Sequence, residues 1–278
     1  MPIVKVRHYG RWVAVGLILL IIAAMLQSMT FNTRFKWDIV AHYMFDPAIL
    51  QGLLNTIWLT VASMVIGIIL GTILAIMRIS GNPLLSGFAS AYVWLFRGSP
   101  LLVQLIFWYN ISALYPQISL GIPFGPTLFS FDANQYITIY VAALLGLSLN
   151  EGAYMSEIVR SGLNAVPAGQ REAAEALGMC NGRVLFRIIL PQAMRIIVPP
   201  TGNQFIGMLK TTSLVSVIAM QELLYSAQLI YSVNFQTIPL LIVASIWYLV
   251  LTTILSVGQF YVERHFARGH AATAKTEA

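Results

Sequence analysis

Long runs of apolar residues, separated by polar breaks, constrain the fold of this chain more than any other feature of its sequence. The apolar core of a bilayer is about 30 Å thick, and a helix needs roughly 20 mostly apolar residues to cross it. Runs of about that length occupy residues 12–28, 52–77, 98–114, 136–158, 191–209 and 238–260. They predict an all-α membrane protein with about six transmembrane helices.

The amino-acid composition agrees with a membrane protein and argues against several other classes. Hydrophobic residues make up 58% of the 278 residues and charged residues only 9%, against roughly 25% charged residues in soluble globular proteins. The single cysteine, Cys180, has no partner for a disulfide, and no histidine or cysteine spacing fits a metal site. The excess of 16 Lys and Arg over 10 Asp and Glu is typical of cytoplasmic loops in membrane proteins. We therefore expect one membrane domain, no metal and no nucleic-acid partner.

Two interpretations fit the first apolar run. It follows Lys5, Arg7 and Arg11, as the apolar region of a signal peptide would. The run is longer than the roughly 7 to 15 apolar residues that are usual in signal peptides, so we expect an uncleaved helix.

The distribution of Lys and Arg predicts the orientation of the chain. If the N-terminus is cytoplasmic, the two long outer loops, residues 29–50 and 115–135, hold only Arg34 and Lys36. Most of the other basic residues then lie in inner segments, in agreement with the positive-inside rule. We therefore expect both termini on the cytoplasmic side of a bacterial inner membrane. The outer loops are rich in Phe, Pro, Gly and Tyr, and we expect short interfacial helices there.

The longest predicted cytoplasmic connection, residues 161–190, has helical periodicity. Pro167 can start a helix, Gly178 can end it, and Asn181 with Gly182 marks a turn before a second amphipathic stretch. The pattern predicts two short helices with a sharp corner. The first helix is too short to be stable alone, so it either docks on a partner or lies on the lipid headgroups. Physical reasoning leaves both alternatives open.

A motif in this segment resembles a known family. The motif consists of Glu172-Ala173-Ala174, then Gly178, then Ile188-x-Leu190-Pro191. It is similar to the EAA signature of permeases in binding-protein-dependent ABC importers. Flanking stretches resemble the branch that imports polar amino acids (histidine, glutamate, glutamine, arginine) and opines. These stretches are FRGSPLLVQLIFWY at 96–109, NEGAYMSEIVRSGL at 150–163, VPAGQREAAEALG at 166–178 and LKTTSL at 209–214. The resemblance covers about Leu50 to Arg264.

That resemblance implies an ATPase-coupling site in the cytoplasmic loop. The helix that ends at Gly178 looks like the coupling helix, which docks on a separate ATP-hydrolysing subunit. The coupling residues would be Glu172, Ala173, Ala174, Gly178, Ile188, Leu190 and Pro191. The sequence contains no Gly-x-x-x-x-Gly-Lys-Ser/Thr phosphate loop, so ATP would be bound by the partner. The chain itself would be a transport subunit without catalytic residues or a cofactor.

The same resemblance implies the domain organisation and the partners. Residues 51–264 would form a five-span permease domain that contains the coupling loop, 161–190. Residues 1–50 would add a cytoplasmic segment, an extra transmembrane helix and an outer loop, and residues 265–278 a cytoplasmic tail. The implied partners are a cytoplasmic ATPase dimer, a second permease chain, identical or related, an extracytoplasmic solute-binding protein and the lipid bilayer.

The fifth apolar run carries a polar cluster at membrane depth. Pro199 and Pro200 lack backbone N–H groups, so the helix should bend or open there. Thr201, Asn203 and Gln204 follow directly, and polar groups at this depth are tolerated only inside protein or beside a water-filled cavity. They either line a path for the solute, which we prefer, or form hydrogen bonds between helices.

The fourth run places Asn150 and Glu151 near its centre. A carboxylate in mid-membrane is costly, so a place in the solute path is one interpretation of Glu151. The alternatives are a buried hydrogen bond to the fifth span or a protonated, packed carboxyl group. Glu157 and Arg160 are three residues apart and are predicted to form a structural ion pair, and Gln104 is predicted to be a packing group.

Two other classes of function fit the sequence less well. A secondary transporter or channel for a small polar solute would show similar broken spans, but it would not need the docking signature. A membrane-embedded enzyme would need paired carboxylates, a histidine cluster or a Ser-His arrangement, and the sequence contains none at a plausible spacing. The sequence does not identify the solute.

Overall fold

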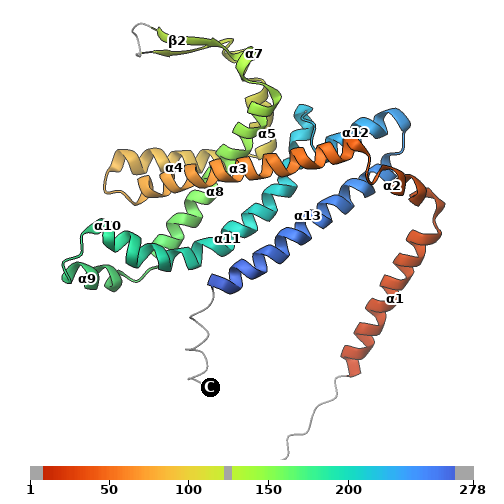
Figure 1. Cartoon of the computed structure of the whole chain (residues 1–278), viewed down its shortest axis with the longest axis horizontal. Coiled ribbons are helices and arrows are strands. Elements are labelled where there is room, and N and C mark those ends of the chain that lie inside the picture. The colour runs from red at the N-terminus through yellow and green to blue at the C-terminus, as the bar shows by residue number, and fades with distance from the viewer. Residues whose placement is uncertain (1–8, 122–126, 267–278) are drawn as a thin grey trace, which may run out of the picture.

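The computed structural model describes residues 9–121 and 127–266, and these residues are mostly helical. Figure 1 shows long helices packed beside one another, a two-stranded hairpin that projects from the bundle, and a first helix that stands away from it. Most of the predicted cytoplasmic tail, residues 267–278, lies outside the described residues, as do residues 1–8 of the predicted N-terminal segment.

Five long helices correspond to five of the six predicted spans. They are α1 (Tyr9–Phe31), α3 (Pro47–Ile79), α8 (Ile139–Asn164), α11 (Leu190–Thr211) and α13 (Thr237–Phe266). Four helical segments are long and apolar enough to cross a membrane: Gly10–Phe31, Pro47–Ile79, Asn181–Ile218 and Thr237–Phe266. α8 has 26 residues, so at about 1.5 Å per residue it also has the length, although it carries several charged side chains. The helical membrane fold is confirmed, while the count of six spans stays a prediction.

The third predicted span, residues 98–114, is not a single helix. α4 (Pro83–Gly98) ends where that span was expected to begin, and α5 (Leu101–Tyr109) and the short α6 (Ile111–Leu114) follow. α4 and α5 meet at an angle of 101°. Pro100 explains the break, because proline disfavours a helical conformation of the preceding residue and cannot donate the hydrogen bond that a continuing helix needs. The two helices together form one bent apolar segment.

The two outer loops differ in structure. The first contains the short helices η1 (Thr33–Phe35) and α2 (Trp37–Tyr43), as expected. The second forms an antiparallel hairpin of β1 (Gln117–Gly121) and β2 (Thr127–Asp132), followed by α7 (Ala133–Tyr136). The expectation of interfacial helices alone is wrong here, because apolar and polar residues alternate along β1 and from Phe129 to Asp132 of β2, and this pattern favours β-structure. The fold is therefore helical with one small hairpin.

The predicted cytoplasmic connection contains two short helices, as the sequence indicated. These are α9 (Ala168–Ala176) and α10 (Asn181–Val184). A π-helical turn, η2 (Leu185–Ile189), joins α10 to α11, and η3 (Thr212–Ile218) extends α11 at its other end. α12 (Leu223–Asn234) then leads into α13.

α11 runs without a break through Pro199 and Pro200. Of the two expected outcomes, a bend or an opening of the helix, the opening is wrong. The two prolines remove only the hydrogen bonds to the carbonyls of Arg195 and Ile196, both exposed residues, and the helix continues on either side. The Pro199 carbonyl also accepts a hydrogen bond from Gln259 Nε2 of α13, at 2.9 Å. This contact ties the middle of α11 to its neighbour.

Small residues bring α3 and α8 into close contact at the centre of the bundle. A Cβ atom added at Gly71 would lie 2.8 Å from the Gly152 carbonyl oxygen, and one at Gly67 would lie 2.7 Å from Cγ of Glu151. Ordinary Cβ contacts are longer, so a larger residue at either position would push the helices apart. Because the helices are this close, each polar residue of α8 has a fixed position along the axis of α3.

α1 stands apart from the bundle. Its described side chains are exposed, and Figure 1 shows it diverging from the other helices. Its C-terminal end is held in place, because Trp37 Nε1 donates a hydrogen bond to the Met29 carbonyl at 2.9 Å. Close by in the chain, Lys36 Nζ donates one to Gln236 Oε1 at 2.8 Å. The predicted extra helix is present, and it adds nothing to the buried core of the described residues.

Candidate functional sites

A glycine turn closes the short helix α9 at its C-terminal end. Gly178 has a φ of +77°, a left-handed conformation that L side chains rarely adopt. Its N–H donates to the Glu175 carbonyl at 2.9 Å, and the Met179 N–H donates to the Ala174 carbonyl at 3.1 Å. This pair of hydrogen bonds is a Schellman motif, which ends a helix and turns the chain. The structure therefore contains the sharp corner that the sequence predicted.

The residues of α9 divide between an exposed face and a packed face. Glu172 and Ala173 are exposed, whereas Ala174 is buried against Val184 and Ile189. α9 thus rests on the segment that leads into α11 and leaves its other side free. Figure 1 shows α9 and α10 at the far end of the bundle from α12.

The remaining predicted coupling residues connect the loop to α11. Ile188 lies in the π-helical turn and packs against the Ala174 cluster. Leu190 and Pro191 are the first two residues of α11, where proline is well tolerated. Leu177, which the sequence analysis did not select, is 83% exposed. It lies four residues after Ala173, so both side chains lie on the same side of the helix end and form one free apolar surface.

Amide side chains satisfy the backbone at the break between α4 and α5. Gln104 Nε2 donates to the Phe96 carbonyl at 2.9 Å and to the Ser99 carbonyl at 3.1 Å. Asn150 Nδ2, from α8, donates to the same Phe96 carbonyl at 2.8 Å. Unpaired carbonyls are costly at membrane depth, so both amides stabilise the bent segment. Asn150, selected for the solute path, is engaged in this contact, and so is Gln104, predicted to be only a packing group.

Glu151 is buried between three helices. Its side chain is 4% exposed and lies against Gly67 of α3. Gln204 Nε2 of α11 is 3.3 Å from Glu151 Oε1 and 3.4 Å from Oε2. The structure therefore brings together two of the predicted path residues, from the fourth and the fifth predicted spans. The contact has the geometry of the interhelical hydrogen bond that the sequence left open as an alternative.

The other predicted path residues of α11 lie on different sides of the helix. Thr201 lines a cavity of about 740 Å³ between α3, α8, α11 and α13. Asn203 is exposed, and Pro199 and Pro200 are half-buried. In this conformation the predicted cluster therefore does not line one common space.

The cavity beside Thr201 is almost entirely apolar. Its polar lining side chains are Thr72, Thr201 and Gln259. The two threonine hydroxyls donate to carbonyls of their own helices, and Gln259 Nε2 donates to the Pro199 carbonyl and to Glu263 Oε1. These donors already have acceptors, so they leave few groups with which the cavity could recognise a polar solute.

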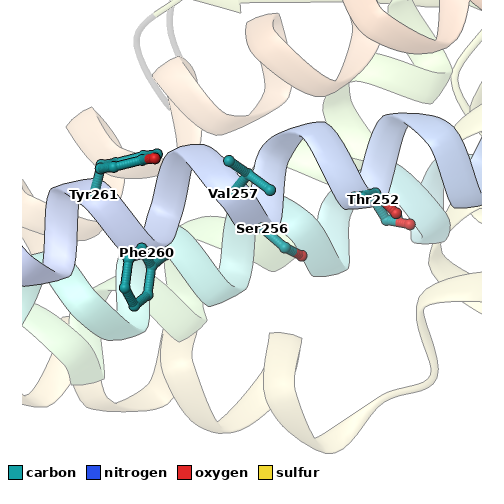
Figure 2. Close-up of a pocket in the computed structure, with 6 residues that line it drawn as sticks. Thr252, Ser256, Val257, Phe260 and Tyr261 are labelled. Carbon is teal, nitrogen blue, oxygen red and sulfur yellow. The ribbon is translucent and has the colours of Figure 1, made fainter.

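A hollow on the surface of α13 and clusters of metal-binding side chains are two further candidates, and neither offers a site among the described residues. A surface hollow of about 350 Å³ is lined only by residues of α13, from Thr252 to Tyr261. Figure 2 shows that its side chains are spread along this one helix, and the hydroxyls of Thr252 and Thr253 donate to carbonyls of the same helix. In residues 9–121 and 127–266, no group of three or more His, Cys, Asp or Glu side chains could hold a metal ion.

Glu157 is the centre of a larger charge cluster than the sequence predicted. The expected pair is present, with Arg160 Nη2 2.8 Å from Glu157 Oε2. Two further arginines converge on the other oxygen, because Arg78 Nη1 of α3 lies 2.8 Å and Arg97 Nη1 of α4 lies 3.3 Å from Glu157 Oε1. The Arg97 guanidinium also lies over the Tyr154 ring, 5.2 Å from its centroid. No local spacing could have indicated that these residues meet.

The sequence analysis did not select Glu222, which is a second buried carboxylate. It is fully buried and caps α12 by accepting the backbone N–H groups of Leu224 at 2.9 Å and Tyr225 at 2.7 Å. It also accepts the Tyr248 hydroxyl of α13 at 2.7 Å. The role is structural, because Glu222 caps α12 and its contact with Tyr248 ties this helix to α13.

Comparison with known families identifies the class of protein that contains this loop and this bundle. A family model described as the inner membrane component of binding-protein-dependent transport systems matches residues 67–268. The chain belongs to that family. It is therefore a permease subunit of a binding-protein-dependent transport system, and the alternative of a secondary transporter or channel is not favoured.

This permease has similar relatives along nearly its whole length. It is 49% identical over 270 residues to ArgU of Corynebacterium glutamicum, described as an arginine transport system permease protein, across 96% of this chain and 83% of that one. It is 39% identical to TcyB of Bacillus subtilis, described as an L-cystine transport system permease protein, across 87% of this chain and 96% of that one.

Solved structures agree with the fold of the permease. It is similar, with a TM-score of 0.68 and 34% identity, to a chain in the crystal structure of an amino acid ABC transporter with histidines, across 82% of this chain and 98% of that one. A chain of the MetNI methionine ABC transporter has a TM-score of 0.61 at 17% identity, across 80% of this chain and 97% of that one. The second likeness concerns the fold alone.

Proposed function

We propose that this permease translocates a polar amino acid that an extracytoplasmic binding protein delivers, and that ATP hydrolysis on a separate subunit drives the import. The observation that carries the proposal is the exposed, glycine-capped helix α9 in the predicted cytoplasmic loop of a binding-protein-dependent permease. The relatives described as arginine and cystine permeases, and the transporter crystallised with histidines, support an amino acid as the solute.

The coupling step follows from the two faces of α9. Its exposed side, with Glu172, Ala173 and Leu177, docks in a groove on the ATPase, and small residues let the two surfaces approach closely. Its packed side carries Ala174, which rests against Ile189 at the entry to α11. A displacement of α9 by the ATPase therefore reaches α11 as a rigid-body movement, because the two are packed together and the Gly178 turn holds their angle.

The assembly contains two permease chains, identical or related, and two ATPase subunits, which bind the ATP. Both termini of the permease lie in the cytoplasm. The solute path runs along α8 and α11. The buried contact of Glu151 with Gln204 supports a closed state of that path, in which the two helices are held together. Separation of α8 from α11 exposes both side chains to the solute, and Asn150, Thr201 and Asn203 lie beside this route.

Reconstitution tests the proposal directly. The permease, its ATPase and the binding protein are placed in proteoliposomes, and uptake is measured for each of the standard amino acids with ATP on the side of the ATPase. We expect uptake of one or a few polar amino acids that needs both ATP and the binding protein. An ATPase variant that binds but does not hydrolyse ATP is the control. Uptake driven by an ion gradient without ATP would contradict the proposal and favour a secondary transporter.

A further inference from the structure

The charge cluster around Glu157 has an unbalanced charge. Three guanidinium groups, those of Arg78, Arg97 and Arg160, converge on this one carboxylate. Among the described residues, none of the three forms an ion pair with any other carboxylate. Three positive charges against one negative charge leave an excess of two, so the cluster favours a further anion.

The three arginines are not equivalent. Arg160 uses both Nε and Nη2 to bind one carboxylate oxygen, at 3.1 and 2.8 Å. The Arg78 side chain is only 17% exposed. Arg97 has one ion-pair contact, at 3.3 Å, and its side chain is 42% exposed. A guanidinium carries five N–H donors in one plane, so Arg97 has the most donors left for another acceptor.

The cluster lies within the predicted fourth span, near its predicted cytoplasmic end. Glu157 is seven residues, or about 10 Å, before the end of α8 at Asn164, and Tyr154 is about 15 Å before it. Arg97 lies over Tyr154, and Asn150 binds the carbonyl of the neighbouring Phe96. These contacts place the Arg97 guanidinium about 10 to 15 Å before the end of α8, at the level of residues 154–157 of the predicted fourth span, 136–158.

A half-exposed guanidinium at this depth does not face lipid hydrocarbon. A charge there costs at least about 2.5 kcal/mol on insertion scales, and charged side chains in spans face the bundle interior or a water-filled route. Arg97 shares its surroundings with Tyr154 and Glu157, which follow Asn150 along one side of α8 at intervals of four and three residues. This side of α8 and the end of α4 form a polar surface inside the membrane.

We propose that Arg97 binds the α-carboxylate of the amino acid during its passage, with Glu157 holding the guanidinium in place when no solute is present. The inference rests on the proposed function, since it needs an amino acid as the solute. A planar guanidinium matches a carboxylate in two parallel hydrogen bonds. Glu157 competes for the same donors, which keeps the binding weak enough for the solute to leave, as conduction requires.

Cysteine labelling tests whether Arg97 faces water and solute. In a Cys180→Ser background, Arg97→Cys is treated with a negatively charged methanethiosulfonate reagent in proteoliposomes that contain the complex. We expect labelling if position 97 faces water. Arg97→Cys lacks the guanidinium, so protection by solute is measured at Tyr154→Cys, beneath an intact Arg97. There the transported amino acid should slow labelling about tenfold, while its decarboxylated amine should not. Leu95→Cys, at the same depth but on the opposite side of α4 and also exposed, is the matched control and should not react.

Uptake measurements separate recognition from a structural role of the cluster. Arg97→Gln should reduce uptake per assembled complex about tenfold, since a charge-assisted contact is lost, and Arg97→Lys should restore part of it. Arg78→Gln removes the shorter contact to the same Glu157 oxygen, 2.8 Å long, on the enclosed side and should mainly lower the yield of complex.

Three results would overturn the inference: no labelling at position 97, equal protection of Tyr154→Cys by the amine, or wild-type uptake in Arg97→Gln. A loss of complex yield in Arg97→Gln that matches Arg78→Gln, with normal uptake per complex, would also overturn it in favour of a purely structural cluster. If the wild-type complex transports no amino acid at all, the proposed function fails and this inference falls with it.

Discussion

The cytoplasmic loop and the centre of the bundle use polar and small residues in opposite ways. On α9, Glu172 and Ala173 are left exposed, and the turn at Gly178 is built from backbone hydrogen bonds alone. At the centre of the bundle, Glu151 is buried between α3, α8 and α11, and Glu151 and Asn150 each bond to a group of another helix. The loop therefore leaves side chains free for another protein, while these two side chains are engaged within the chain. Substitutions should therefore affect binding in the first region and folding or passage of solute in the second.

The largest effect is expected at Gly178. A branched side chain is strained at a φ of +77° by about 1 to 3 kcal/mol, so Gly178→Val should tilt or unwind the end of α9. We expect poor assembly or ATP hydrolysis without transport, with uptake at least about tenfold below the wild type. Uptake and ATP turnover per assembled complex are the measurements. Gly182→Ala is the control, because Gly182 has open space around it and no left-handed conformation. Normal uptake in Gly178→Val would show that the turn after α9 does not require glycine at position 178.

Ala173→Asp should release the ATPase and leave the membrane helices folded. Ala173 is exposed on the free side of α9, so the new charge disturbs only a partner surface. We expect about tenfold less ATPase to copurify, with an unchanged melting temperature of the permease. Leu177→Ser should act in the same direction and more weakly. An intact complex with normal uptake in both variants would place the docking surface elsewhere.

Glu151→Gln separates the two interpretations of the buried carboxyl group. If Glu151 shapes the solute path, uptake per assembled complex should fall severalfold while the complex forms at normal levels. If the group only holds α8 to α11, the yield and the melting temperature should fall instead. Asn203→Ala is measured in parallel, because Asn203 is exposed on α11 and has no part in the contact with Gln204. Unchanged uptake per complex in both variants would remove these residues from the path.

The smallest effect is expected at Asn150, the neighbour of Glu151. Its amide donates to the Phe96 carbonyl at the break of α4 and α5. Loss of that bond in Asn150→Ala should reduce the free energy of unfolding by about 1 kcal/mol. We expect a slightly lower melting temperature and normal uptake per complex, measured on the same preparations as Glu151→Gln. A strong loss of uptake at normal stability would show that Asn150 contacts the solute and does not only lie beside its route.

Local patterns in the sequence predicted the parts of the fold that depend on neighbouring residues. Apolar runs of membrane length predicted the long helices, and Pro167 with Gly178 predicted α9 and its turn. The broken third span could have been predicted too, since Pro100 lies inside the apolar run, two residues after the end of α4. The alternation in Gln117–Gly121 and in residues 129–132 was a usable signal for the hairpin.

Contacts between distant residues could not be predicted in this way. Arg78, Arg97 and Glu157 lie on three helices, and only the packing of α4 and α8 against α3 brings them together. The capping of α12 by Glu222 and its contact with Tyr248 likewise depend on tertiary packing. The expectation that α11 opens at Pro199 and Pro200 was wrong for a related reason. Local hydrogen-bond loss indicated a weak point, but the continuous helix and its contact with Gln259 were not visible in the sequence.

The helix continues without a break from α10 through η2, α11 and η3, so this segment can move as one rigid lever. Asn181–Ile218 is one helical segment of 38 residues, about 57 Å long if every residue rises 1.5 Å. A tilt of about 10° around a pivot near one end of such a segment would move the other end by about 10 Å. A short push against α9, which is packed on the inner arm of this lever, could therefore open a gap the width of an amino acid at the opposite face of the membrane.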